Sequence, residues 1–91
     1  MPDVIQGRVS FIMDQRTFSI EISHVGAKNS DKYLTTETVR ILHLKTSMLD
    51  KVTTSHSKIE LEKLLKDQQV KCWVHHRDSY HRIVADIAIL N

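Results

Sequence analysis

The chain has 91 residues, of which 41% are hydrophobic, and its formal net charge is +2 with histidine neutral. This length accommodates one domain with one modest core, and the apolar fraction excludes a compositionally disordered chain. This net charge is too small to establish a nucleic-acid partner. It does not exclude such a partner, because local patches of positive charge matter more for binding than the net charge of the chain. We therefore treat residues 1–91 as a single domain.

The cysteine count and the hydropathy exclude several further classes of protein. Cys72 is the one cysteine, so neither an intrachain disulfide nor a cysteine-based zinc site can form. It lies in the apolar run VKCWV, where we expect a buried and inert thiol. No apolar run approaches the ~18 residues of a membrane span, and the N-terminus lacks the pattern of a secretory signal. We expect a soluble, cytoplasmic protein that has no membrane partner.

Two short β-prone runs open the chain, at residues 5–12 and 17–23. In the second run Phe18, Ile20 and Ile22 alternate with polar residues, which is typical of a half-buried strand with a polar outer face. The four residues between the runs, MDQR, predict a hairpin turn, although they lack the Asn-Gly or Asp-Gly signature of the strongest turns.

The next segment changes from loop to strand character. Residues 25–32 contain Gly, Asn, Ser and Asp and predict a loop. Residues 33–44, YLTTETVRILHL, are rich in Thr, Val, Ile and Leu and predict the third strand. Because these twelve residues are long for one strand, we expect a bend or bulge inside it. Residues 45–55 predict a polar connection.

The clearest helix signal follows this connection. Ser57 precedes Glu60 by three residues, which is the spacing of a capping box. Leu61, Leu64 and Leu65 form one apolar face at helical spacing. We expect a helix over about residues 58–68 that plugs one end of a sheet or barrel.

Residues 70–74 and 80–90 predict a fourth and a fifth strand, joined by a hairpin turn at 75–79. The order is strand, strand, strand, helix, strand, strand. This order predicts a mainly β fold, a five-stranded OB-fold-like Greek-key barrel with one helix between strands 3 and 4. An open α+β sheet with one packed helix is the alternative, because periodicity does not separate the two.

The last hairpin carries a dense polar cluster, VHHRDSYHR, at residues 74–82. Its three histidines, with His43 approaching from the third strand, could suggest a metal site. Their spacing matches no standard zinc pattern, and His75 and His76 point to opposite faces of an extended strand. We expect a solvated hairpin edge that holds no metal, and a protein with no cofactor.

Three segments together resemble the staphylococcal-nuclease-like (thermonuclease) domain, an OB-fold variant. The segments are MDQRT at 13–17, VRILHL at 39–44 and DSYHRIVA at 78–85. They resemble the family's Asp-Gly-Asp-Thr turn, its arginine-presenting strand and its Asp-x-Tyr-Gly-Arg strand start. The resemblance spans roughly residues 5–90 and covers only the barrel part of the family domain, because the family's C-terminal helices have no counterpart in this sequence.

The resemblance implies phosphodiester cleavage, with Ca²⁺ held by carboxylates, a glutamate as base and two arginines on the phosphate. Residue by residue, Arg40 and Arg82 fall on the two arginine positions, and Asp14 falls on the first acid of the turn. The family's other acidic positions carry different residues here, namely Arg16, Lys45 and Met48.

The site therefore has four cations against one carboxylate, whereas acids dominate the family's pattern. A positive site repels Ca²⁺ and attracts phosphate directly, and Met48 cannot accept a proton. We expect a catalytically degenerate, non-enzymatic module that binds nucleic acid, either DNA or RNA, or another phosphate-bearing ligand. The phosphate-binding residues that we expect are Arg16, Arg40, Lys45 and Arg82.

Other side chains near the last hairpin leave further functions open. Trp73 and Tyr80 flank the expected turn and are candidates for stacking on bases, although packing in the core is another role for Trp73. His81, beside Arg82, could act as an acid or base without a metal. With a second histidine nearby, that arrangement would make a weak metal-independent nuclease.

The arginines also have structural interpretations. Arg40 could form an ion pair with Glu37, and Arg82 could form one with Asp78 across the turn. A barrel can also keep its fold and lose its ligand. A protein-interaction or self-associating module is therefore the main alternative function.

Overall fold

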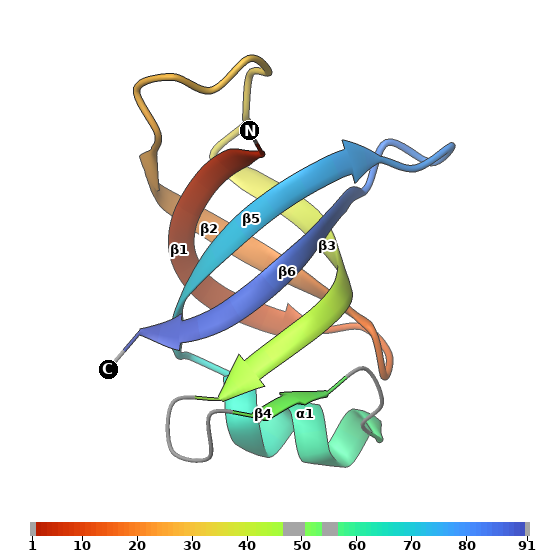
Figure 1. The fold of residues 1–91 in the computed structure, drawn as a ribbon. Helices are drawn as coiled ribbons and strands as arrows, with labels where there is room; N and C mark the ends of the chain where they lie inside the picture. The colour runs from red at the N-terminus through yellow and green to blue at the C-terminus, as the bar shows by residue number, and fades with distance from the viewer. Residues whose placement is uncertain (1, 47–50, 54–56, 91) are drawn as a thin grey trace.

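The computed structural model describes residues 2–46, 51–53 and 57–90. Five long strands wrap into a barrel, and one helix lies across its lower end in the view of Figure 1. The long strands are β1 (Asp3–Ile12), β2 (Thr17–Val25), β3 (Thr36–Thr46), β5 (Gln69–Arg77) and β6 (Ile83–Leu90). A short strand β4 (Lys51–Thr53) and the helix α1 (Lys58–Leu65) lie between β3 and β5.

The barrel is closed. The strand order is β2-β1-β5-β6-β3, and an additional pairing of β2 with β3 completes the ring. Neighbouring long strands are antiparallel except for β3 and β6, which run parallel. These pairings confirm the predicted five-stranded OB-fold-like Greek-key barrel, with its helix between the third and fourth long strands, and they exclude the open sheet.

Register shifts bend the long strands around the barrel. The pairing of β1 with β2 shifts between Gln6 and Gly7, where a Cβ on Gly7 would lie 2.2 Å from the backbone oxygen of Glu21. Only glycine allows this close approach of two backbones. The pairing of β3 with β6 shifts between Ile41 and His43, which confirms the bulge predicted inside the third strand.

The core fills the barrel with side chains from every long strand and from the helix. Phe18 is fully buried. Leu61 and Leu65 of α1 are buried against strand residues at the end of the barrel that the helix covers. Cys72 is also buried, and burial raises the pKa of its thiol to about 12, so the thiol stays protonated as predicted.

The helix begins as predicted and ends earlier. The Ser57 hydroxyl accepts from the Glu60 amide at 3.1 Å, and the Ser57 amide donates to the Glu60 carboxylate at 3.5 Å, which confirms the capping box. Asp67 has a φ of 63° and donates its amide to the Val9 carbonyl, which turns the chain into β5. No helix in the described ranges is long and apolar enough to cross a bilayer.

Two boundaries near the polar segments differ from the prediction. The connection predicted over residues 45–55 contains β4, which pairs with the end of β3. The last turn lies at residues 78–82, because β5 continues through His75 and His76. A register shift between Val74 and His76 interrupts the alternation there, and both histidines are exposed.

The loop from β2 to β3 is anchored to β1 through Asp3. The Asp3 carboxylate accepts from the Ser30 amide at 2.8 Å, the Asp31 amide at 2.9 Å and the Tyr33 hydroxyl at 2.7 Å. Hydrogen bonds from Ser30 and Tyr33 lower the pKa of Asp3 to about 2. This carboxylate therefore fixes the loop to the barrel at neutral pH.

Candidate phosphate-binding site

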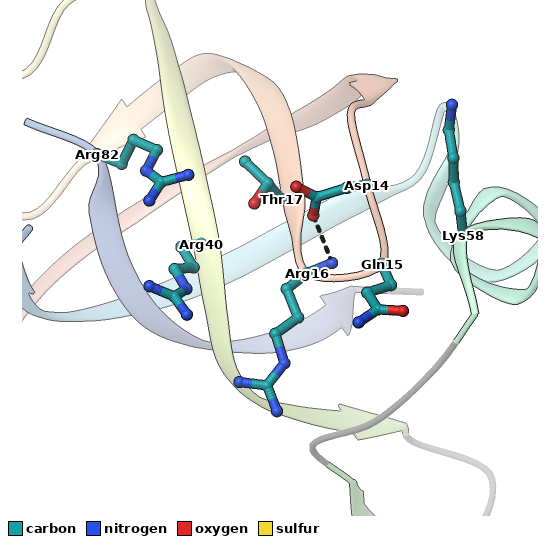
Figure 2. Close-up of a pocket in the computed structure, with 7 residues that line it drawn as sticks. All are labelled: Asp14, Gln15, Arg16, Thr17, Arg40, Lys58 and Arg82. Carbon is teal, nitrogen blue, oxygen red and sulfur yellow. Dashed lines mark hydrogen bonds between the residues drawn. The ribbon is translucent and has the colours of Figure 1, made fainter. Parts of the chain in front are cut away.

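A surface cavity of about 510 Å³ lies where the β1–β2 turn meets β3 and the start of β6. Figure 2 shows the residues that line it: Asp14, Gln15, Arg16, Thr17, Arg40, Lys58 and Arg82. Four of these seven residues are cations and one is a carboxylate. The cavity thus brings together three of the four predicted phosphate-binding residues and adds Lys58.

Arg40 is placed by the pairing of β3 with both of its neighbours. It lies opposite Thr17 of β2 and opposite Val84 of β6. The flanking residues Val39 and Ile41 are buried, so the alternation of the strand directs the Arg40 side chain outward. Arg40 therefore stands between the β1–β2 turn and the start of β6.

The β1–β2 turn presents Arg16 in a fixed conformation. The amides of Met13 and Asp14 donate to the Thr17 carbonyl at 2.8 and 3.3 Å. The Arg16 amide donates to Asp14 Oδ1 at 2.8 Å, and the Ile41 amide donates to the Arg16 carbonyl at 2.7 Å. The bond from the Ile41 amide ties the turn to β3, and the side chains of Arg16 and Arg40 both line the cavity (Figure 2).

Asp14 is the carboxylate of the cavity, and its role is to hold the turn. Burial by itself would raise the pKa of Asp14. Hydrogen bonds from the Arg16 amide and from Thr17, together with the positive charge of Arg82, hold that pKa below its usual value. Asp14 therefore stays ionised at neutral pH and reduces the positive charge of the site without cancelling it.

Arg82 is oriented by Asp78 across the last turn. Arg82 Nε donates to Asp78 Oδ2 at 2.7 Å, and the Arg82 amide donates to Asp78 Oδ1 at 3.0 Å. This is the cross-turn ion pair that the sequence predicts. The bond uses Nε, so the two Nη groups of Arg82 keep their capacity to donate to an anion at the cavity.

Arg16 and Arg40 differ from Arg82 in their charge partners. In the part of the chain that the structure describes, neither guanidinium forms an ion pair. The alternative interpretation, in which Arg40 pairs with Glu37, does not hold, because Glu37 binds Arg77 instead, at 3.2 and 3.0 Å. The cavity thus contains two arginine side chains whose charge no described carboxylate neutralises.

The remaining residues predicted for the site lie at different places. Lys45 lines a second cavity, on the outer face of β3, β5 and β6, together with the half-buried Trp73. Tyr80 is 77% exposed at the tip of the last turn, with its ring 5.2 Å from the Arg82 guanidinium carbon. His81 is exposed and does not line the cavity around Arg40. Met48 lies outside the described residues.

The histidines are separated by the barrel into different surroundings. His43 and His75 both contact Asp86, whereas His81 lies in the last turn with a φ of 63°. Within the described ranges, no group of three or more His, Cys, Asp or Glu side chains is placed to hold a metal ion. The cluster VHHRDSYHR thus contributes to more than one surface.

Lys58 is the residue of the cavity that sequence reasoning missed. The capping box predicts that the helix begins there, so its place in the secondary structure could be predicted. Its place beside the β1–β2 turn depends on how α1 closes the barrel, which no local pattern encodes.

Comparisons of this chain with protein-family models, with curated proteins and with solved structures found no match.

Proposed function

We propose that this protein is a non-catalytic barrel module that binds nucleic acid, or another phosphate-bearing ligand, at the cavity around Arg40. The observation that carries the proposal is the set of three arginines on one cavity, two of them without an ion-pair partner among the described residues. A guanidinium presents a planar fork of N–H donors that matches the oxygens of a phosphate. Lys58 adds a fourth positive charge to the same cavity.

The same residues support binding without catalysis. A Ca²⁺ ion needs several oxygen ligands, and the cavity offers one carboxylate, Asp14, among four cations. Asp14 Oδ1 already accepts from the Arg16 amide, so this carboxylate is part of the turn and is poorly placed to activate a water. A bound phosphodiester would be held and not hydrolysed. Such a module would be a catalytically degenerate relative of the thermonuclease-like domains. We also propose that the protein is located in the cytoplasm.

Salt-dependent binding tests the proposal. A short single-stranded oligonucleotide titrated into ¹⁵N-labelled protein should shift the resonances of Arg40, Arg82 and the β1–β2 turn. Affinity should fall steeply with salt, and Arg40→Gln should reduce the slope of log K against log[salt] by about one. Lys28→Gln is the matched control, because Lys28 is an exposed cation in the β2–β3 loop that does not line this cavity. Equal slopes for both variants would contradict the proposal.

Exposed apolar side chains favour a second candidate, a protein-interaction or self-associating module. Leu34 is 72% exposed, Ile59 is 66% exposed and Phe11 is 58% exposed. A self-associating module would show a mass in sedimentation that rises with protein concentration, and it would lack the salt-dependent oligonucleotide binding. A metal-independent nuclease using His81 gains no support from the cavity, because His81 does not line it.

A further inference from the structure

The outer face of β5, β6 and β3 carries a second polar cluster that the phosphate site does not use. Asp86 of β6 lies opposite Trp73 of β5 on one side and opposite His43 of β3 on the other. The neighbours of Asp86 in its strand, Ala85 and Ile87, are buried, so the Asp86 side chain faces outward. The three side chains therefore form one row across three adjacent strands.

Asp86 fixes two imidazoles beside the tryptophan. His43 Nδ1 and His75 Nε2 each lie 2.9 Å from an oxygen of the Asp86 carboxylate. Burial would raise the pKa of Asp86, but the hydrogen bonds from His75 and His43 lower it overall. An ionised carboxylate only accepts, so both rings must donate to it. In the neutral imidazoles, His43 Nε2 and His75 Nδ1 are left as acceptors.

A cavity of about 370 Å³ lies against this row. It is lined by His43, Lys45, Trp73, Asp86 and Ile87. The Lys71 ammonium lies 5.0 Å from the centre of the Trp73 ring. The site thus combines the half-buried Trp73 ring with hydrogen-bonding groups and with two lysines. Lys45 and Lys71 both lie opposite Ala88, in the next row on the same side.

The two cavities lie along the same pair of parallel strands. β3 carries Arg40 and then His43, and β6 follows Arg82 and carries Asp86. On β6, Asp86 lies two residues beyond Val84, the partner of Arg40, and four residues beyond Arg82. With a rise of about 3.3 Å per residue, the two sites are separated along the strands by roughly 7–13 Å. A ligand of a few linked units can therefore reach both sites.

We propose that the cavity at Trp73 is a stacking site for one base of a single-stranded nucleic acid whose backbone lies at the Arg40 cavity. The inference rests on the proposed function and extends it from a phosphate to a strand. An aromatic face next to positive charge is the combination by which proteins hold single strands without reading their sequence. A base paired in a duplex is stacked within the helix and cannot lie on the indole, so the site selects single strands.

Joining two weak sites through one ligand raises affinity. Once the backbone is bound at the Arg40 cavity, the base is presented to Trp73 at a high effective concentration. A short oligonucleotide should therefore bind much more tightly than either inorganic phosphate or a free nucleoside.

Trp73 is the sole tryptophan of the chain, which makes its fluorescence a direct probe of the site. We expect a deoxythymidine tetranucleotide to quench the Trp73 emission on binding. An abasic tetranucleotide of the same charge should bind about tenfold more weakly and leave the emission unchanged. Equal affinity of the two oligonucleotides would overturn the stacking site and leave the phosphate site standing.

Two variants separate this inference from the proposed function. Trp73→Leu should weaken tetranucleotide binding about tenfold in an anisotropy titration, and Trp73→Phe should restore most of the loss because an aromatic face returns. Arg40→Gln should weaken binding and reduce its salt slope, while saturating ligand still quenches Trp73. Unchanged binding by Trp73→Leu with impaired binding by Arg40→Gln would refute the stacking site alone. Two results would refute both the stacking site and the phosphate site. One is that the wild-type protein binds no oligonucleotide, and the other is that an acidic peptide quenches Trp73 whereas the oligonucleotide does not.

Discussion

Two arginines of the last hairpin, Arg77 and Arg82, lie five residues apart and belong to different regions of the molecule. Arg77 Nε donates to Asp31 at 2.8 Å, and both of its Nη groups donate to Glu37, which is 8% exposed. The Arg77 guanidinium also donates to the carbonyls of Lys32 and His81. These contacts join β5 to the β2–β3 loop, to β3 and to the last turn.

The cavity around Arg40 presents the opposite arrangement. Arg82 has one carboxylate partner, Asp78, while Arg16 and Arg40 form no ion pair with any described residue. Where acceptors surround a guanidinium, as at Arg77, removing the arginine leaves a buried carboxylate uncompensated. Where no carboxylate pairs with the guanidinium, as at Arg40, the arginine contributes little to the fold and its donors are open to a ligand. The comparison indicates that partners, not residue type, separate a structural arginine such as Arg77 from one that no carboxylate neutralises.

The largest effect that we expect comes from Arg77→Ala. It should reduce the free energy of unfolding by about 3 kcal/mol, because Glu37 would remain buried without its partner. Arg40→Ala is the matched variant and should change the free energy of unfolding by less than about 0.5 kcal/mol. Urea titrations of both variants make the comparison. Similar losses for the two would show that the distinction between the regions is wrong.

A second prediction concerns Asp3, which anchors the loop that carries Asp31 to the barrel. Its pKa is about 2 in the folded protein and would be about 4 in an unfolded chain, so its ionised form stabilises the fold fully above about pH 4. This contribution is lost as the pH falls from 4 towards 2. Asp3→Asn should therefore be less stable than the wild type by about 2 kcal/mol at pH 7. The difference should shrink near pH 2 in urea titrations, and a constant difference would contradict the assignment.

The smallest effect concerns the turn between the two arginines. His81 has a φ of 63°, a conformation that glycine adopts at little cost and other residues do not. His81→Gly should raise the free energy of unfolding by about 0.5 kcal/mol and leave phosphate binding unchanged, since His81 does not line the cavity. Thermal unfolding and an oligonucleotide titration check both parts. A loss of binding in this variant would place His81 in the site after all.

Much of the fold could be predicted from local patterns, because those patterns reflect short-range physics. The alternation around Ile20, the capping box of Ser57 and Glu60, and the length of the third strand each correspond to an observed feature. The exact ends of elements were harder to predict. The helix stops at Leu65 because the next residues turn to bond β1, and that contact joins distant parts of the chain.

The candidate site was predicted only in part for the same reason. Arg16, Arg40 and Arg82 line one cavity, a grouping that the sequence suggested only through the resemblance of three segments to the thermonuclease-like domain. Lys45 lines the neighbouring cavity with Trp73, and Lys58 takes a place in the first. The position of the bulge in β3 and the seating of α1 decide both outcomes. The length of the strand predicted that a bulge is present, but no local pattern indicates its position or the seating of α1.

The amino-acid sequence by itself determined the order of the long strands and the helix, because alternation and capping act between near neighbours. Its composition also determined the buried thiol and the arginine-rich character of the turn segments. Only the tertiary structure decided which arginine is neutralised. Arg77 meets Glu37 across 40 residues of chain once the barrel closes, and Glu37 is the residue that the sequence offered as an alternative partner for Arg40. Charge compensation depends on distances in space, so the closed barrel had to be known before structural and binding arginines could be separated.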